Sequence, residues 1–258
     1  MVKDVGLTGE QLYLFGDWEN SYGLPSCEVI IDFDGAKVAK AEGKQEKKDA
    51  LSNTVENAIK NIMAEKLCKN VDFSDLSSPT ANVVLTSLRD FRSTFPNLPL
   101  LDFVEGYNGT AKKILRGRRR TVHSVSMRFT RYRTESGHVY NMIFINPRYY
   151  GEGSSTEVYP DDGFHPPLCT TAKSDFEHEL GHMLDYSLDV QSDKKIRVLY
   201  RNLRKTKSIT SKLSEYANKN TREFIAEAWS EYCNNPTPRE IACTVSSRIF
   251  ELYAQKYK

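Results

Sequence analysis

Apolar residues in the first half of the chain recur at spacings typical of both helices and strands. From residue 45 to residue 70 they return every three or four positions, which predicts a long amphipathic helix. A second helix is expected from Ser77, whose hydroxyl can cap it, to the break at Pro96. Apolar runs at 27–33 and 98–104 are each followed by a glycine-containing turn, so both are predicted to be strands.

The middle of the chain alternates apolar and polar positions with a period of two. This alternation covers residues 125–133, and a second apolar run covers 139–146. A turn-forming segment at 135–138 separates the two runs, so they are predicted to pair as a hairpin. The stretch 148–173 is rich in Gly, Pro, Ser and Asp and is expected to be a mobile loop.

The second half of the chain is predicted to be mostly helical. Apolar residues keep a helical spacing over four segments, at 174–186, 192–206, 220–232 and 237–253. Capping residues stand at three of these starts: Ser174 with Glu177, Asn220 or Thr221, and Thr237 with Glu240. The whole pattern predicts an α+β fold, with a mixed sheet and helices followed by a mostly helical C-terminal half.

The amino-acid composition is that of an ordinary soluble protein and excludes few classes of function. The 258 residues include 36 basic and 34 acidic ones, so net charge gives no argument for a nucleic acid or a membrane. The chain has no apolar run long enough to span a bilayer and no apolar core of a signal peptide at its start. We therefore expect a cytoplasmic protein, or one delivered to a target cell by a route that these residues do not encode.

The cysteines and isolated histidines are expected to be structural. Five cysteines, an odd number without a Cys-x-x-Cys pair, favour free thiols. Cys169 and His165 could hold a second metal, but the two prolines between them favour a rigid loop. His123, His138 and His165 are expected to be surface or turn residues.

One motif carries specific chemistry. His178, Glu179 and His182 form a His-Glu-x-x-His pattern inside a predicted helix. On a helix, residues four apart project from the same face, so both imidazoles can bind one metal ion while Glu179 stands beside them. The alternative is an amphipathic helix that happens to carry these residues, so the remaining ligand has to be found.

A catalytic zinc site needs a third protein ligand, and the helix at 220–232 offers candidates. Glu223, Glu227 and Glu231 fall on one face of this helix at four-residue intervals, among many apolar residues. Three acids in such a row are often only a solvated face. Either Glu223 or Glu227 could therefore be the third ligand.

These two motifs together resemble the lethal-factor-like zincin metallopeptidases of toxins and phage or mobile-element proteins, which include the catalytic domain of anthrax lethal factor. The resemblance runs from about residue 139 to the C-terminus, with Ile225 and Trp229 where relatives carry Phe. It implies one zinc ion per chain, bound by the two motif histidines and Glu223. It also implies Tyr216 as a catalytic residue, and Asp185 and Glu227 as residues that orient the imidazoles.

The resemblance implies a zincin-like metallopeptidase domain at 76–258. Residues 1–75 would be an N-terminal strand–helix segment, either integral to this domain or separate from it. The expected function is a zinc-dependent endopeptidase of the gluzincin type, with Glu179 as general base and Tyr216 as oxyanion donor. In zincins a strand before the active helix commonly binds the substrate along its edge. That role would fall on Val139, Asn141, Ile143 and Ile145, although this strand could equally be interior.

Other function classes remain open from the sequence. A catalytically silent zincin-like domain could serve as a binding or virion module. A nucleic-acid-binding protein could use the basic stretch 112–133, although a solvated surface explains that stretch more simply. The expected partner is a protein or peptide substrate rather than a membrane. Neither the cleavage specificity nor the oligomeric state follows from these residues.

Overall fold

The structure is a computed structural model that describes residues 32–33, 36–37, 54–106, 125–154 and 162–257. The chain divides into two compact units, Met1–Ala50 and Leu51–Lys258. In the first unit, β1 (Asp32–Phe33) and β2 (Ala36–Lys37) pair antiparallel. Most of the strand predicted at 27–33 lies outside the described residues.

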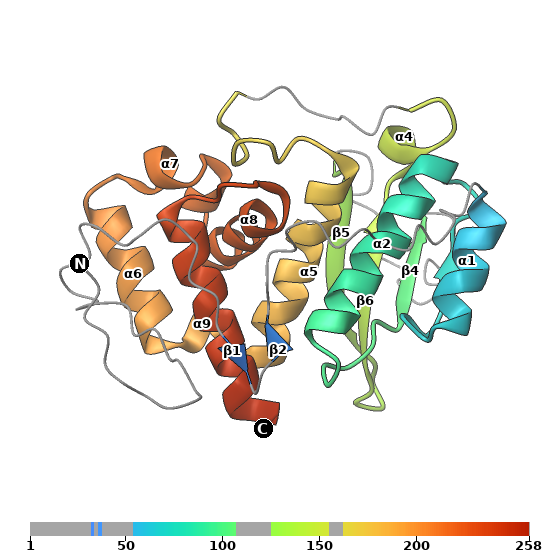
Figure 1. Ribbon diagram of the computed structural model, residues 1–258, viewed down its shortest axis with the longest axis horizontal. Helices are drawn as coiled ribbons and strands as arrows, with labels where there is room; N and C mark the ends of the chain where they lie inside the picture. Colours follow the sequence, from blue (N-terminus) through green and yellow to red (C-terminus); the bar gives the residue numbers. More distant parts are fainter. Residues whose placement is uncertain (1–31, 34–35, 38–53, 107–124, 155–161, 258) are drawn as a thin grey trace. The chain divides into compact units, whose positions relative to one another are not determined.

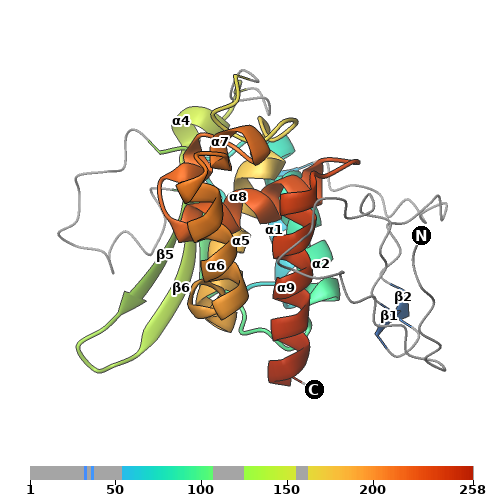
Figure 2. The same cartoon turned by 90° about the vertical axis from the view of Figure 1, so that its left-hand side faces the viewer.

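The second unit contains helices and a four-stranded mixed sheet, which confirms the predicted α+β class. Its helices are α1 (Val55–Ala64), α2 (Ser78–Thr94), α4 (Pro147–Tyr150), α5 (Ala172–Leu188), α6 (Lys194–Lys205), α7 (Ile209–Lys212), α8 (Thr221–Asn234) and α9 (Glu240–Tyr257), with the 3-10 turns η2 (Val190–Ser192) and η3 (Tyr216–Asn218). Its strands are β3 (Val71–Asp72), β4 (Phe103–Gly106), β5 (Met127–Arg133) and β6 (Val139–Ile145). Helix α5 lies between the sheet and the C-terminal helices (Figures 1 and 2).

The sheet has the order β3-β4-β6-β5, in which β5 is an edge strand and β6 is interior. The predicted hairpin is confirmed, because β5 and β6 pair antiparallel, while β6 pairs parallel with β4 on its other side. The assignment of Val139, Asn141, Ile143 and Ile145 to a substrate-binding edge is therefore wrong. The main-chain groups of Asn141, for example, are occupied by Asp102: the Asp102 N–H donates to the Asn141 carbonyl and the Asp102 carboxylate accepts from the Asn141 N–H.

Helix starts follow local capping chemistry, in one case not where the sequence suggested. The α8 cap is confirmed, since the Asn220 side chain accepts hydrogen bonds from the N–H groups of Arg222 and Glu223. Helix α5 begins at Ala172, two residues before the predicted Ser174. Its cap is Thr171, which forms a capping box with Ser174, so the Ser174–Glu177 box is wrong. A serine hydroxyl can close that box as a glutamate would, and the sequence pattern did not allow for it.

Other boundaries differ by a few residues. Helix α2, capped by Ser77, closely matches its prediction, but α1 covers only part of the predicted 45–70, of which 45–53 lies outside the described residues. The strand predicted at 98–104 begins only at Phe103, and α9 begins at Glu240 rather than near Thr237. Helix α1 packs on α2, and β3 pairs with β4.

Helices α5 and α8 pack closely against each other, and Gly181 allows their approach. A Cβ atom at Gly181 would lie 2.8 Å from Ala226 Cα, a distance that side-chain Cβ atoms do not tolerate. The backbone of α8 therefore comes directly against α5 at this point. Nearby, the rings of Phe95, Trp229 and Phe250 pack against one another and join α8 and α9 to the end of α2.

Two further sequence expectations can be compared with the described residues. Cys68, Cys169 and Cys233 are free thiols, as predicted, whereas Cys243 takes part in a disulfide, so the expectation is wrong for that residue. Among the helices in the described part of the chain, none is both long and apolar enough to cross a membrane.

Candidate metal centre

Helices α5 and α8 bring together three side chains that could hold a metal ion. His178 and His182 come from adjacent turns of α5, and Glu223 comes from the first turn of α8. One ligand atom from each lies within 4.8 Å of the others. Oε2 of Glu223 is 3.3 Å from His178 Nε2 and 3.1 Å from His182 Nε2. Two imidazoles and one carboxylate are a donor set found in catalytic zinc sites.

The hydrogen bonding and ionisation of Glu223 suit a bound metal ion better than a cluster in which the three side chains satisfy only one another. Its Oε2 atom is buried and makes no hydrogen bond, although both imidazole nitrogens are close to it. Burial raises the pKa of Glu223, but the neighbouring His178 and His182 rings outweigh this and hold it well below its usual range. The carboxylate is therefore ionised, as a ligand must be.

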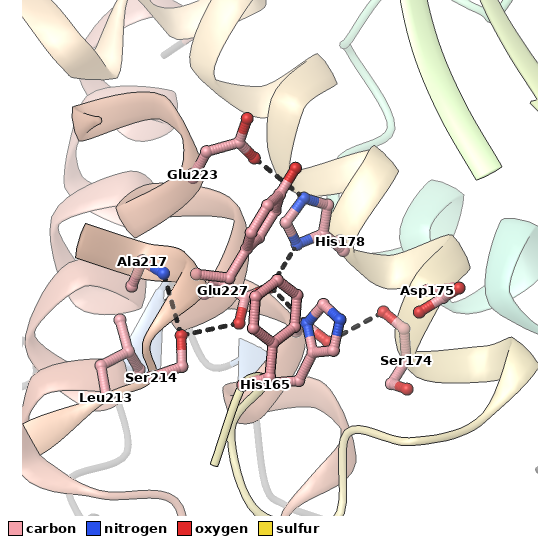
Figure 3. A network of polar contacts seen from close by, with 12 residues as sticks. His165, Ser174, Asp175, His178, Leu213, Ser214, Ala217, Glu223 and Glu227 are labelled. Carbon is pink, nitrogen blue, oxygen red and sulfur yellow. Dashed lines mark hydrogen bonds and ion pairs between the residues drawn. The ribbon is translucent and has the colours of Figure 1, made fainter. Parts of the chain in front are cut away.

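Glu227 fixes the other side of the His178 ring. Its Oε1 lies 2.8 Å from His178 Nδ1, while His178 Nε2 faces Glu223, so the two carboxylates flank one imidazole (Figure 3). The Ser214 hydroxyl donates to Oε2 of Glu227 at 2.8 Å. Burial raises the pKa of Glu227, but His165 and His178 lower it to about 2. His178 Nε2 thus faces Glu223, and Glu227 lies on the other side of the ring, outside the group of His178, His182 and Glu223 that could hold a metal ion.

The pKa of His178 reflects the same surroundings. Burial disfavours its charged form, but Glu223 and Glu227 act in the opposite direction and raise the pKa well above the usual value. The third acid of the row, Glu231, is fully buried and accepts hydrogen bonds from the main chain and side chain of Arg239. The row is thus not a solvated face, because Glu227 and Glu231 are both buried.

His165 belongs to the site, which the sequence did not predict. Its Nδ1 lies 3.1 Å from Oε1 of Glu227, so Glu227 stands between His165 and His178 (Figure 3). The segment around it is fixed to η3, because Tyr216 N–H donates to the carbonyl of Phe164. No local spacing links residue 165 to residue 227, so only the fold reveals this contact. Cys169 is not part of the His178, His182 and Glu223 cluster.

Glu179 points towards the sheet. Its Oε2 accepts a hydrogen bond from the N–H of Phe129 in the edge strand β5. Glu179 is buried and close enough to contribute to the raised pKa of the neighbouring His178. The general-base candidate therefore lies where α5 meets the edge strand β5.

Tyr216 lies over the metal-binding residues. Its ring centroid is 5.9 Å from that of His178 and 5.6 Å from that of His165. Lys219 Nζ donates to its hydroxyl at 3.0 Å and also lies 3.7 Å from Oε1 of Glu223. The phenol that the sequence assigned to catalysis is thus brought to the centre, together with a lysine that the sequence did not single out.

Asp185 is fully buried but takes a different place from the one expected. Its Oδ1 accepts from Gln191 N–H at 2.7 Å, and its Oδ2 lies 3.7 Å from Arg222 Nε. Burial raises its pKa, which Gln191 and Arg222 partly offset. The structure shows no hydrogen bond between Asp185 and His182, so Asp185 acts on the end of α5 rather than on an imidazole directly.

The basic stretch 112–133 can be followed only in part, since residues 112–124 lie outside the described chain. The described part includes Arg128, Arg131 and Arg133, all exposed on β5. Arg131 lies over the ring of Tyr186, 5.6 Å from its centroid. Comparisons with family models, curated proteins and solved structures found no match to this chain.

Proposed function

We propose that this protein is a zinc-dependent endopeptidase of the gluzincin type, with His178, His182 and Glu223 as metal ligands. The observation that carries the proposal is the convergence of these three ligand atoms within 4.8 Å of one another. When bound, zinc would lower the pKa of a water molecule and polarise the carbonyl of the scissile peptide bond.

The protein groups around the ligands suit the remaining chemistry. Glu179 would take the proton of the attacking water and pass it to the leaving amine. Tyr216, whose hydroxyl accepts from Lys219, would donate its own proton in a hydrogen bond to the developing oxyanion. Glu227 would hold the His178 ring with Nε2 available.

The edge strand β5 offers a path for an extended substrate. Phe129 donates its N–H to Glu179 and not to β6, so this N–H points to the edge of β5 that pairs with no other strand in the described part of the chain. Main-chain groups alternate along an antiparallel strand, so those of Met127 and Arg131 face the same edge. A peptide that paired with this edge would lie next to Glu179.

Metal analysis and a cleavage assay test the proposal together. Purified wild type should contain about one zinc per chain, and the His178→Ala, His182→Ala variant should contain none. A mixed peptide library should be cleaved by wild type but not by Glu179→Gln, which should retain its zinc. Cleavage that persists in Glu179→Gln, or zinc that persists without both histidines, would refute the mechanism. If wild type contains zinc but cleaves no peptide of the library, the protein would be a metal-binding module without peptidase activity.

A further inference from the structure

The strongest concentration of charge in the described residues lies away from the metal centre. Between residues 194 and 212 the sequence contains eight lysines and arginines and no acidic residue. All eight are exposed, on α6, on α7 and on the segment joining them. We call this the α6–α7 basic surface. Helices α6 and α7 lie on the side of α5 opposite to the sheet (Figure 1).

Neighbouring carboxylates leave most of this charge uncompensated. Asp193 caps α6 and pairs with Arg248 at 2.7 Å, so it is already occupied. Lys195 pairs with Glu251 at 3.5 Å, and Arg204 lies over the ring of Tyr200. In the described part of the chain, the other six cations of the surface form no ion pair.

We propose that the α6–α7 basic surface binds the phosphate backbone of a nucleic acid without reading its bases. Lysine and arginine neutralise phosphates, and a row of them along a helix is a typical footprint of such binding. Helix α6 has twelve residues and is about 18 Å long, comparable with five base pairs of a duplex. No aromatic side chain is exposed there on which an unpaired base could stack, which favours a duplex over a single strand.

Two other polyanion partners fit this surface less well. A membrane-bound helix needs an apolar face for the lipid, whereas Ile196, Tyr200 and Leu203 of α6 are buried in the protein. Stable protein interfaces have an apolar centre and are poor in lysine, while this surface has no large exposed apolar side chain. The proposal is independent of the peptidase function, because none of the metal-binding residues is involved.

Binding to a fluorescent 20-base-pair duplex of arbitrary sequence, measured by anisotropy between 50 and 200 mM salt, tests this proposal. The test variant is Arg197→Gln, Arg201→Gln, Lys205→Gln, and the matched control is Arg128→Gln, Arg131→Gln, Arg133→Gln on β5. Both remove three exposed positive charges. Circular dichroism and zinc content should show that both variants fold as wild type does.

Wild type should bind more weakly as salt rises. In a plot of log K against log salt, each phosphate contact contributes a slope of about 0.9. The α6 variant lacks three positive charges, so its slope should be smaller than that of wild type by about 2 to 3. The β5 variant and the His178→Ala, His182→Ala variant should bind as wild type does. Absence of duplex binding at 50 mM salt, or equal losses in the α6 and β5 variants, would overturn the proposal. Tighter binding to phosphatidylserine vesicles or to polyglutamate than to the duplex would also overturn it, in favour of a membrane or an acidic protein.

Discussion

Glu223 and Glu227 are one helical turn apart on α8, yet their carboxylates meet opposite nitrogens of the same imidazole. The sequence left open which of them binds the metal. We predict that Glu223→Gln loses a ligand, whereas Glu227→Gln keeps the ligand set and binds zinc about 10- to 100-fold more weakly. Competition with a chromophoric chelator measures both affinities. A larger loss of zinc affinity in Glu227→Gln than in Glu223→Gln would mean that Glu227 is the metal ligand and Glu223 is not.

The Tyr216 hydroxyl can be removed without loss of the ring. The Tyr216→Phe variant keeps the ring that packs on His178 and removes only the hydroxyl. We expect kcat to fall by about 100- to 1000-fold with KM and zinc content nearly unchanged, because the hydroxyl would act only in the transition state. Steady-state kinetics with any cleaved library peptide measures this. An unchanged kcat would remove Tyr216 from the mechanism.

Cys68 allows a prediction of pH dependence. Burial raises the pKa of its thiol to about 12, while its Sγ donates to the carbonyl of Leu101. The unfolded thiol ionises near pH 8.5, so above that pH the unfolded state gains relative stability and the fold loses about 1.4 kcal/mol per pH unit from this residue. Urea unfolding at pH 8 and pH 10 should show this loss in wild type. The loss should be smaller in Cys68→Ala, and an equal loss in both proteins would contradict the prediction.

At the scale of elements, the α8 cap links helix stability to the site. The Asn220 side chain accepts from Glu223 N–H, so it positions the main chain of a ligand. Asn220→Ala should destabilise the fold by about 1 kcal/mol and also weaken zinc binding. Ser77→Ala, which removes the cap of α2, is the matched control and should cost similar stability with no effect on zinc. Equal zinc affinity in Asn220→Ala and Ser77→Ala would show that the α8 cap does not affect zinc binding.

The close contact of α5 and α8 gives a second prediction at this scale. Gly181→Ala would place Cβ 2.8 Å from Ala226 Cα, so the two helices must move apart. Overpacking of this kind costs about 1 to 3 kcal/mol, which outweighs the helix-forming advantage of alanine of about 1 kcal/mol. Because the ligands lie on both helices, zinc affinity should fall as well. Urea unfolding and chelator competition measure the two effects, and a more stable variant with unchanged affinity would contradict the prediction.

The sequence predicted the elements well where one local pattern decides them. Helix α2, the α8 cap and the β5–β6 hairpin follow from spacing and capping residues alone. The strand order could not be predicted in this way, because the position of β6 between β4 and β5 depends on pairing between segments distant in the sequence. The motif histidines and Glu223 could be proposed from spacing and resemblance. The contact of His165 with Glu227 joins residues 62 positions apart and has no local signature.

At the scale of the molecule, a metal ion shared by α5 and α8 would act as a cross-link. The proposed ligands His182 and Glu223 are 41 positions apart along the chain (223 − 182), and an ion bound by both in the folded state only would hold α5 and α8 together. Free zinc at 100 times its Kd should stabilise the protein by about 2.7 kcal/mol and raise Tm by roughly 5 to 10 °C. Thermal unfolding with zinc and with EDTA should show this shift in wild type. The His178→Ala, His182→Ala variant should show none.

The hydrogen bond from Phe129 to Glu179 would couple substrate docking in one register to release of the proposed general base. A peptide strand on the β5 edge needs the Phe129 N–H as a donor for one of its carbonyls, and Glu179 already accepts from that donor. A peptide that placed a carbonyl there would displace Glu179 towards His178, His182 and Glu223. A peptide in another register leaves the carboxylate held by the sheet. Only a peptide bound to β5 in the first of these registers would therefore free Glu179 to accept a proton.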